Sequence, residues 1–156
     1  MATGGRLQRR LEKSLFNPGF RAALRLGIAP RAFALLETIG RRSGRLRLTP
    51  VGNGLDGDVF WLVSEHGRQG AYVKNLIANP RVRVKVGRHW YAGTAAIIDD
   101  DDAHARRRRI DNANGLVGRA DGVIFRVSAS TPVTVRIELE HRPTRNMPQS
   151  NMRHHR

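Results

Sequence analysis

The most chemically suggestive stretch of this chain is GRRSGRLRLTP at residues 40–50, where four arginines fall within seven positions. Glycines let backbone N–H groups converge on an anion, and Ser43 adds a hydroxyl donor. A guanidinium matches phosphate and carboxylate with a planar pair of donors. We therefore expect Arg41, Arg42 and Arg47 to grip such an anion. Composition alone leaves open a hairpin whose arginines are simply solvated.

A second stretch, residues 64–76, joins a glycine-containing loop to a short helical segment. The amino end of a helix attracts anions. Tyr72 is placed to stack on a ring, and Lys74 and Asn75 are placed to donate hydrogen bonds. Simple packing is the commoner role for a tyrosine such as Tyr72.

The elements that must hold these residues are short strands separated by turn residues. We expect a small, mostly antiparallel barrel of about six strands with peripheral helices. The predicted strands are 33–39, 45–53, 59–64, 82–86, 90–98 and 133–139, with a hairpin turn at 54–58. The predicted helices are 71–78 and one that begins near Ala103, capped by the acidic run 99–102, with 106–109 at its carboxyl end.

The two ends of the chain are predicted to lie outside the barrel domain, which spans residues 28–140. Residues 1–27 have the apolar periodicity of an amphipathic helix, interrupted at 17–19. This segment either packs on the barrel or docks on a membrane surface. Residues 141–156 are polar, basic and contain two prolines, so we expect a disordered tail.

Composition narrows the class of protein. The chain has 156 residues, a net charge of +15 and no cysteine, which excludes disulfides and thiolate sites. All basic residues except Lys13, Lys74 and Lys85 are arginine, so an anionic partner is expected: nucleic acid, acidic lipid or a small polyanion. No apolar run approaches the about 20 residues of a membrane span, no secretory signal is evident, and the six histidines lack metal-ligand spacing. We expect a cytoplasmic protein, with peripheral contact at the inner face of the membrane as an option, and no metal.

The order of these motifs resembles one known family. GRRSGRLRLTP, a hairpin, FWLVSEHG and then YVKNLIANPRVRVKVG are similar, over Leu15 to Ile98, to the deazaflavin-dependent nitroreductases and quinone reductases. That family consists of split β-barrels that bind coenzyme F-420, usually in actinobacteria. The resemblance implies that the phosphate and glutamate tail of the cofactor are held by Arg41, Arg42, Ser43, Gly44 and Arg47. It places Thr49, Pro50 and Ser64 near the ring, and completes the pocket with His66, Gly67, Tyr72, Lys74 and Asn75.

The resemblance also implies a reaction, namely hydride transfer from the reduced deazaflavin to a quinone, nitroarene or enone. The chain departs from the family loop, because Glu65-His66-Gly67 and Tyr72-Val73 replace a Ser-x-Gly-Gly segment and a Trp-Tyr pair. Its only tyrosines are Tyr72 and Tyr91, so the usual tyrosine wall against the substrate is absent or built from other residues. His66 and Tyr72 are the candidate proton donors. An FMN-binding split barrel and a non-catalytic nucleic-acid binder are the alternatives, and a homodimer is possible for such barrels. Nucleic acid is disfavoured because aromatic residues are few and no recognition motif is present.

Overall fold

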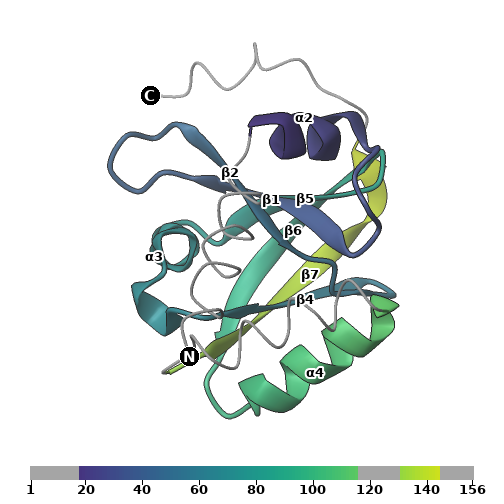
Figure 1. The fold of residues 1–156 in the computed structure, drawn as a ribbon. Helices are drawn as coiled ribbons and strands as arrows, with labels where there is room; N and C mark the ends of the chain where they lie inside the picture. Colours follow the sequence, from purple (N-terminus) through teal and green to yellow (C-terminus); the bar gives the residue numbers. More distant parts are fainter. Residues whose placement is uncertain (1–17, 116–130, 145–156) are drawn as a thin grey trace, which may run out of the picture.

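The computed structural model describes residues 18–115 and 131–144 (Figure 1). Three α-helices, one 3-10 turn and seven strands make up the described chain. In chain order these are α2 (Pro18–Leu26), β1 (Phe33–Ile39), β2 (Leu46–Gly52), β3 (Leu55–Asp56), β4 (Val59–Ser64), η1 (Gly67–Gln69), α3 (Ala71–Ala78), β5 (Arg81–Val86), β6 (His89–Ile98), α4 (Ala103–Ala113) and β7 (Val133–Thr144).

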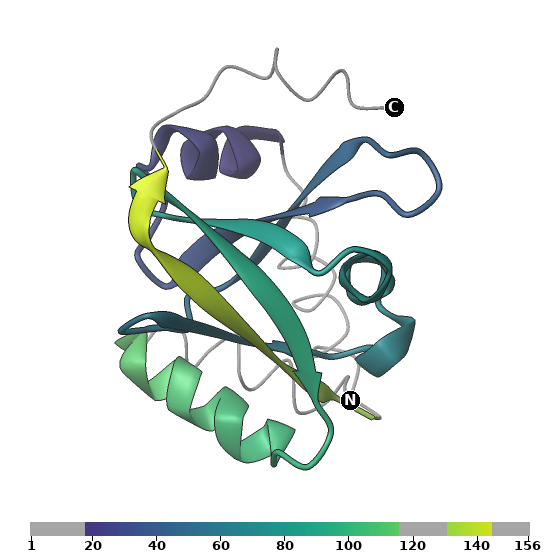
Figure 2. The same cartoon turned by 180° about the vertical axis from the view of Figure 1, so that it is seen from behind.

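The strands form one sheet in the order β2-β1-β5-β6-β7-β4-β3, and every neighbouring pair is antiparallel. Figures 1 and 2 show that the sheet curls, so that β1 and β5 face β4 while β6 and β7 cross steeply between them. The mostly antiparallel barrel with peripheral helices is therefore confirmed. The structure has seven strands rather than about six, because the two-residue strand β3 lies within residues 54–58, which were predicted as a turn.

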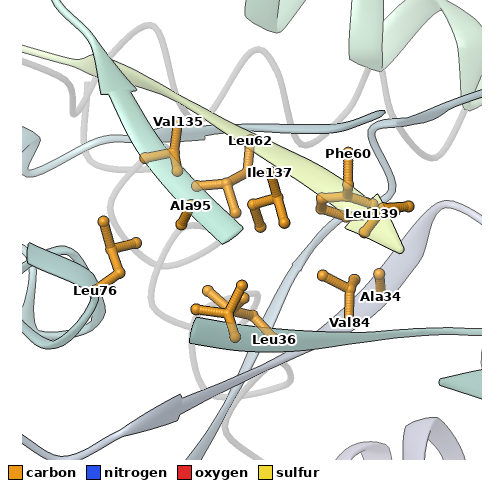
Figure 3. Close-up of a cluster of buried hydrophobic side chains, with 11 residues drawn as sticks. Ala34, Leu36, Phe60, Leu62, Leu76, Val84, Ala95, Val135, Ile137 and Leu139 are labelled. Atoms are coloured by element: carbon orange, nitrogen blue, oxygen red, sulfur yellow. The ribbon is translucent and has the colours of Figure 1, made fainter. Parts of the chain in front are cut away.

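The core lies between these facing parts of the sheet (Figure 3). Leu36 and Val84 meet Leu62 and Ile137 there, and Phe60 is completely buried. Each such side chain contributes roughly 1.5–3 kcal/mol by leaving water. This core makes the barrel a firm scaffold for the residues at its open edge.

The helices cover different parts of the barrel. Helix α2 lies over β1, where the rings of Phe20 and Phe33 meet edge to face at 5.2 Å. This packing favours the first of the two roles predicted for the amino-terminal segment. Helix α4 lies on the far side, against β4, and the Asp102 carboxylate caps it by accepting from the Ala105 N–H at 2.9 Å. No helix within the described ranges is both long and apolar enough to cross a membrane.

Three details of the sequence prediction need correction. Helix α4 continues to Ala113, so the arginines 106–109 lie in its middle rather than at its carboxyl end. The predicted turn 54–58 shrinks to Gly57 and Asp58, since β3 pairs with β4 and Gly57 takes the left-handed φ of +58°. Strand β7 runs on to Thr144, into the segment predicted as a disordered tail. Residues 1–17 and 145–156 lie outside the described part of the chain.

Candidate functional site

Two adjoining cavities open at the edge of the barrel. One, of about 690 Å³, lies among the β1–β2 hairpin, α2 and α3. The other, of about 390 Å³, lies among β2, the end of β4 and α4. Thr49 and Tyr72 line both, so one elongated ligand can occupy the two together.

The larger cavity is basic. Its lining includes five arginines, and the one carboxylate among the described lining residues is that of Glu37. Concentrated guanidinium charge with bidentate geometry is suited to phosphate and carboxylate groups. The arginines come from the hairpin and from α2: Arg41, Arg42, Arg47, Arg21 and Arg25.

The hairpin that carries the predicted anion motif is held by its own backbone. The Gly40 N–H donates to the Arg45 carbonyl and the Gly44 N–H to the Gly40 carbonyl, both at 2.8 Å. A Cβ on residue 40 would lie 2.8 Å from Ser43 Oγ and 3.1 Å from the Arg45 carbonyl oxygen, so a larger residue would displace the Ser43 hydroxyl from its place in the turn. The Ser43 hydroxyl oxygen also accepts from the Arg45 N–H. The sequence therefore specifies a preformed turn that presents arginines to the cavity.

Asn75 ties this hairpin to α3. Its Oδ1 accepts from the backbone N–H and from Nη1 of Arg41, each at 3.2 Å. Its Nδ2 donates to Thr38 Oγ1, also at 3.2 Å. Asn75 is only 6% exposed, and its amide makes these three hydrogen bonds within the protein. In this structure Asn75 positions Arg41 and also lines the basic cavity.

Glu37 is a buried carboxyl on the wall of the basic cavity. Burial raises the pKa of Glu37, and the neighbouring Arg83 guanidinium opposes the rise. Arg83 Nε lies 3.3 Å from Glu37 Oε1, and the guanidinium also lies over the Trp90 ring at 4.4 Å. Glu37 on β1 thus places a carboxyl, paired with Arg83 of β5, in the wall of an otherwise cationic cavity.

The smaller cavity is predominantly apolar. Polar groups are set into its wall at a few points, among them Ser64, His66, Tyr72 and Arg107. A narrow apolar space with few polar groups suits a flat ring system. The apolar lining consists of Phe33, Pro50, Val51, Leu62, Val63 and Ile110.

The loop after β4 is built around two close contacts. The buried Ser64 hydroxyl donates to the Gly67 carbonyl at 3.0 Å. Gly67 has a φ of +56°, and a Cβ there would lie 2.2 Å from the Thr131 carbonyl oxygen. Gly67 therefore shapes the loop and does not itself border either cavity.

Tyr72 stands where the two cavities meet. Burial raises the pKa of Tyr72 to about 12. A side-chain hydrogen bond between Tyr72 and Ser64 and the charge of Arg107 oppose this rise, and the charge of Glu65 adds to it. The phenol consequently stays protonated over the physiological range. Tyr72 offers a hydrogen-bond donor to a ligand, rather than an anion.

Most of the sequence matches the model of one protein family. The family model for F-420H(2)-dependent quinone reductases covers residues 18–140. The chain belongs to this family. The protein is therefore an oxidoreductase whose cofactor is the reduced deazaflavin coenzyme F-420, as the resemblance implied.

Solved structures support the fold of this reductase. One described as an F-420-H2 dependent reductase is 19% identical, covers 69% of this chain and 95% of its own, and has a TM-score of 0.52. One described as a domain-swapped dimer is 16% identical, covers 87% and 100%, and has a TM-score of 0.54. A conserved hypothetical protein from Mycobacterium tuberculosis is 19% identical, covers 75% and 77%, and has a TM-score of 0.51. At these identities the likeness is one of fold, and it confirms the split β-barrel. No curated protein matches the chain in sequence.

Most of the residues predicted for the site border the two cavities of the reductase. Those that do are Arg41, Arg42, Ser43, Arg47, Thr49, Pro50, Ser64, His66, Tyr72 and Asn75. Gly44, Gly67 and Lys74 are absent from both linings. Gly44 has a φ of +66° and serves the turn, while Lys74 lies on a part of α3 that faces neither cavity.

Sequence reasoning missed the residues that helices bring to the reductase site. Arg21 and Arg25 from α2 complete the basic cavity, and Arg107 and Ile110 from α4 complete the apolar one. The sequence feature that could have indicated them is the spacing within each pair, because residues three or four apart share one face of a helix. The donor set fits the cofactor, since a basic cavity beside an apolar one suits a ligand with an anionic tail and a flat ring.

Proposed function

We propose that this reductase transfers a hydride from reduced F-420 to a conjugated acceptor, namely a quinone, a nitroarene or an enone. One observation carries the proposal: a basic cavity and an apolar cavity adjoin at Thr49 and Tyr72. The first suits the phosphate and glutamate tail, and the second suits the deazaflavin ring with room for an acceptor beside it.

Each wall has a separate task in this proposal. The arginines of the hairpin and of α2 bind the anionic tail and so fix the register of the cofactor. Thr49 and Pro50 on β2 line the side of the ring, and Ser64 and Tyr72 line its edge. The roles of Gly44, Gly67 and Asn75 are to hold the loops and Arg41 in place.

The cofactor, when bound, supplies the hydride, and the protein supplies position and exclusion of water. The apolar lining keeps solvent from the reacting groups. The Tyr72 hydroxyl donates a hydrogen bond toward negative charge that develops in the cavity. His66 is exposed at the rim, so its imidazole can pass a proton between solvent and the product.

A fluorescence titration with F-420 tests the proposal. Arg47→Ala should weaken cofactor binding at least tenfold, as expected for the loss of a charge-assisted bond. Arg45→Ala is the matched control, because Arg45 lies on the same hairpin but does not line the cavity. Equal affinities for the two variants would refute the placement of the tail.

The same titration separates the other candidates. Tight binding of FMN without F-420 binding would favour the FMN alternative. Salt-sensitive retention on DNA with no cofactor binding would favour a nucleic-acid binder. A homodimer is also proposed, since a structure of similar fold is described as a domain-swapped dimer. Light scattering of the purified protein measures its mass and decides that point.

A further inference from the structure

Arg107, which lines the apolar cavity, forms a buried ion pair with Asp111. Arg107 and Asp111, on successive turns of α4, are 7% and 5% exposed. Arg107 Nε donates to Asp111 Oδ1 at 2.9 Å. Placing two charges in a protein interior is costly unless their geometry is good, so a buried guanidinium beside an apolar cavity calls for a role.

The guanidinium reaches across the cavity toward β2. At Gly52, the position that a Cβ would occupy is 4.0 Å from Arg107 Nη1 and 3.7 Å from Ile110 Cγ2. Arg107 therefore extends over the strand that also carries Thr49 and Pro50. Because residue 52 is a glycine, no side chain from that position lies beside Arg107 Nη1.

Arg107 also acts on the centre of the site. The positive charge of Arg107 lowers the pKa of Tyr72, and both residues line the same cavity. Among the described residues that line this cavity, Arg107 is the only arginine or lysine. A guanidinium has five N–H donors, so one such group can serve several acceptors, among them Asp111 and a ligand oxygen.

We propose that Arg107, positioned by Asp111, is the oxygen-binding anchor for the electron acceptor, which is therefore a flat apolar molecule bearing a carbonyl or nitro oxygen. This rests on the proposed function, because it assigns the acceptor side of the same site. The Arg107 donors stabilise the negative charge that reaches that oxygen as the acceptor is reduced.

The electrons balance between the reduced cofactor and the acceptor. A quinone acceptor gains one hydride and one proton and leaves as a hydroquinone. The reduced cofactor would supply the hydride from its ring C–H bond and release one proton from a ring N–H to solvent as it is oxidised. The proton on the product oxygen comes from solvent through His66, so the protons balance. No further oxidant or reductant is needed. In place of the missing tyrosine wall, this reductase uses an arginine held on a helix.

Calorimetry with an anionic quinone, 2-hydroxy-1,4-naphthoquinone, tests the anchor directly in the presence of oxidised F-420. Arg107→Gln should weaken this ligand about tenfold to hundredfold. Arg108→Gln is the control, since Arg108 is the exposed neighbour on the same helix. If Arg107→Gln does not fold, the paired change Arg107→Met with Asp111→Leu removes the anchor without leaving a buried charge.

Two readings of F-420 affinity accompany this experiment. Unchanged F-420 binding together with weakened quinone binding supports the anchor. Equal quinone affinity in the variant and the control overturns it, as does an equal loss of F-420 affinity, which would place Arg107 on the cofactor. Failure of the unaltered protein to bind F-420 would instead refute the proposed function.

Discussion

Replacing Asn75 with alanine should damage both stability and cofactor binding, because this one amide joins α3 to the anion-binding hairpin. The substitution removes two bonds to Arg41 and one to Thr38, all at 3.2 Å. At that length each bond is worth roughly 0.5–1 kcal/mol. Thr38, which is 1% exposed, also loses the partner of its hydroxyl in the interior.

The free energy of unfolding should therefore fall by about 2–3 kcal/mol, which lowers the melting temperature by roughly 4–12 °C for a chain of this size. Urea unfolding at constant slope measures the first quantity. Coenzyme F-420 should bind about threefold to tenfold more weakly, because Arg41 loses its fixed orientation. Lys74→Ala is the control on the same helix, since Lys74 lines neither cavity.

A double-mutant cycle with Arg41→Ala separates the clamp from a general loss of stability. The two changes should be non-additive in cofactor binding, because Arg41 has no function in the site once it is truncated. The reasoning is refuted if Asn75→Ala alters stability by less than 0.5 kcal/mol. It is also refuted if the two changes add fully in binding.

Three further predictions concern charge and backbone. Glu37→Gln should raise both the stability at neutral pH and the affinity for F-420. A buried carboxyl whose pKa is raised must lose its proton in the folded state at neutral pH, which lowers the free energy of unfolding. An unchanged melting temperature at pH 7 would contradict this. Asp101 is held by Arg106, which lowers the pKa of that carboxyl, so stability should fall as pH drops below about 4. The fall should be shallower in Asp101→Asn, as melting curves against pH would show. Gly67→Ala should destabilise the protein by about 2 kcal/mol or more, since the added Cβ would overlap the Thr131 carbonyl. A urea unfolding curve with the same midpoint and slope as that of the unaltered protein would contradict this.

The strands and the short helix were predictable because their patterns are local. Val82 and Val84 alternate with charged residues and are buried in the structure, and Asn79-Pro80 ends α3 where the chain must leave helical dihedrals. The extent of α4 was less accessible, since four successive arginines resemble a helix end. Their actual place follows from tertiary contacts, because Arg106 pairs with Asp101 and stacks on Trp61 at 3.7 Å.

The site was predictable on the hairpin and much less so on the helices. Arg41 and Arg47 stand within a compact motif whose residues are neighbours in sequence. Arg25 and Arg107 reach the site only through packing of α2 and α4 on the barrel, which periodicity does not orient. The part of Asn75 that the sequence did not indicate is its bond to Arg41, because the two residues are distant in sequence.

The affinity of the purified protein for two ligands tests the central claim most directly. One is coenzyme F-420, and the other is the same deazaflavin with its ribityl chain but without phosphate or glutamates. If the basic cavity holds the tail, intact F-420 should bind at least a hundredfold more tightly than the truncated form. Arg47→Ala should narrow that ratio, and Arg45→Ala should not. Equal affinity for the two ligands in the unaltered protein would contradict the account.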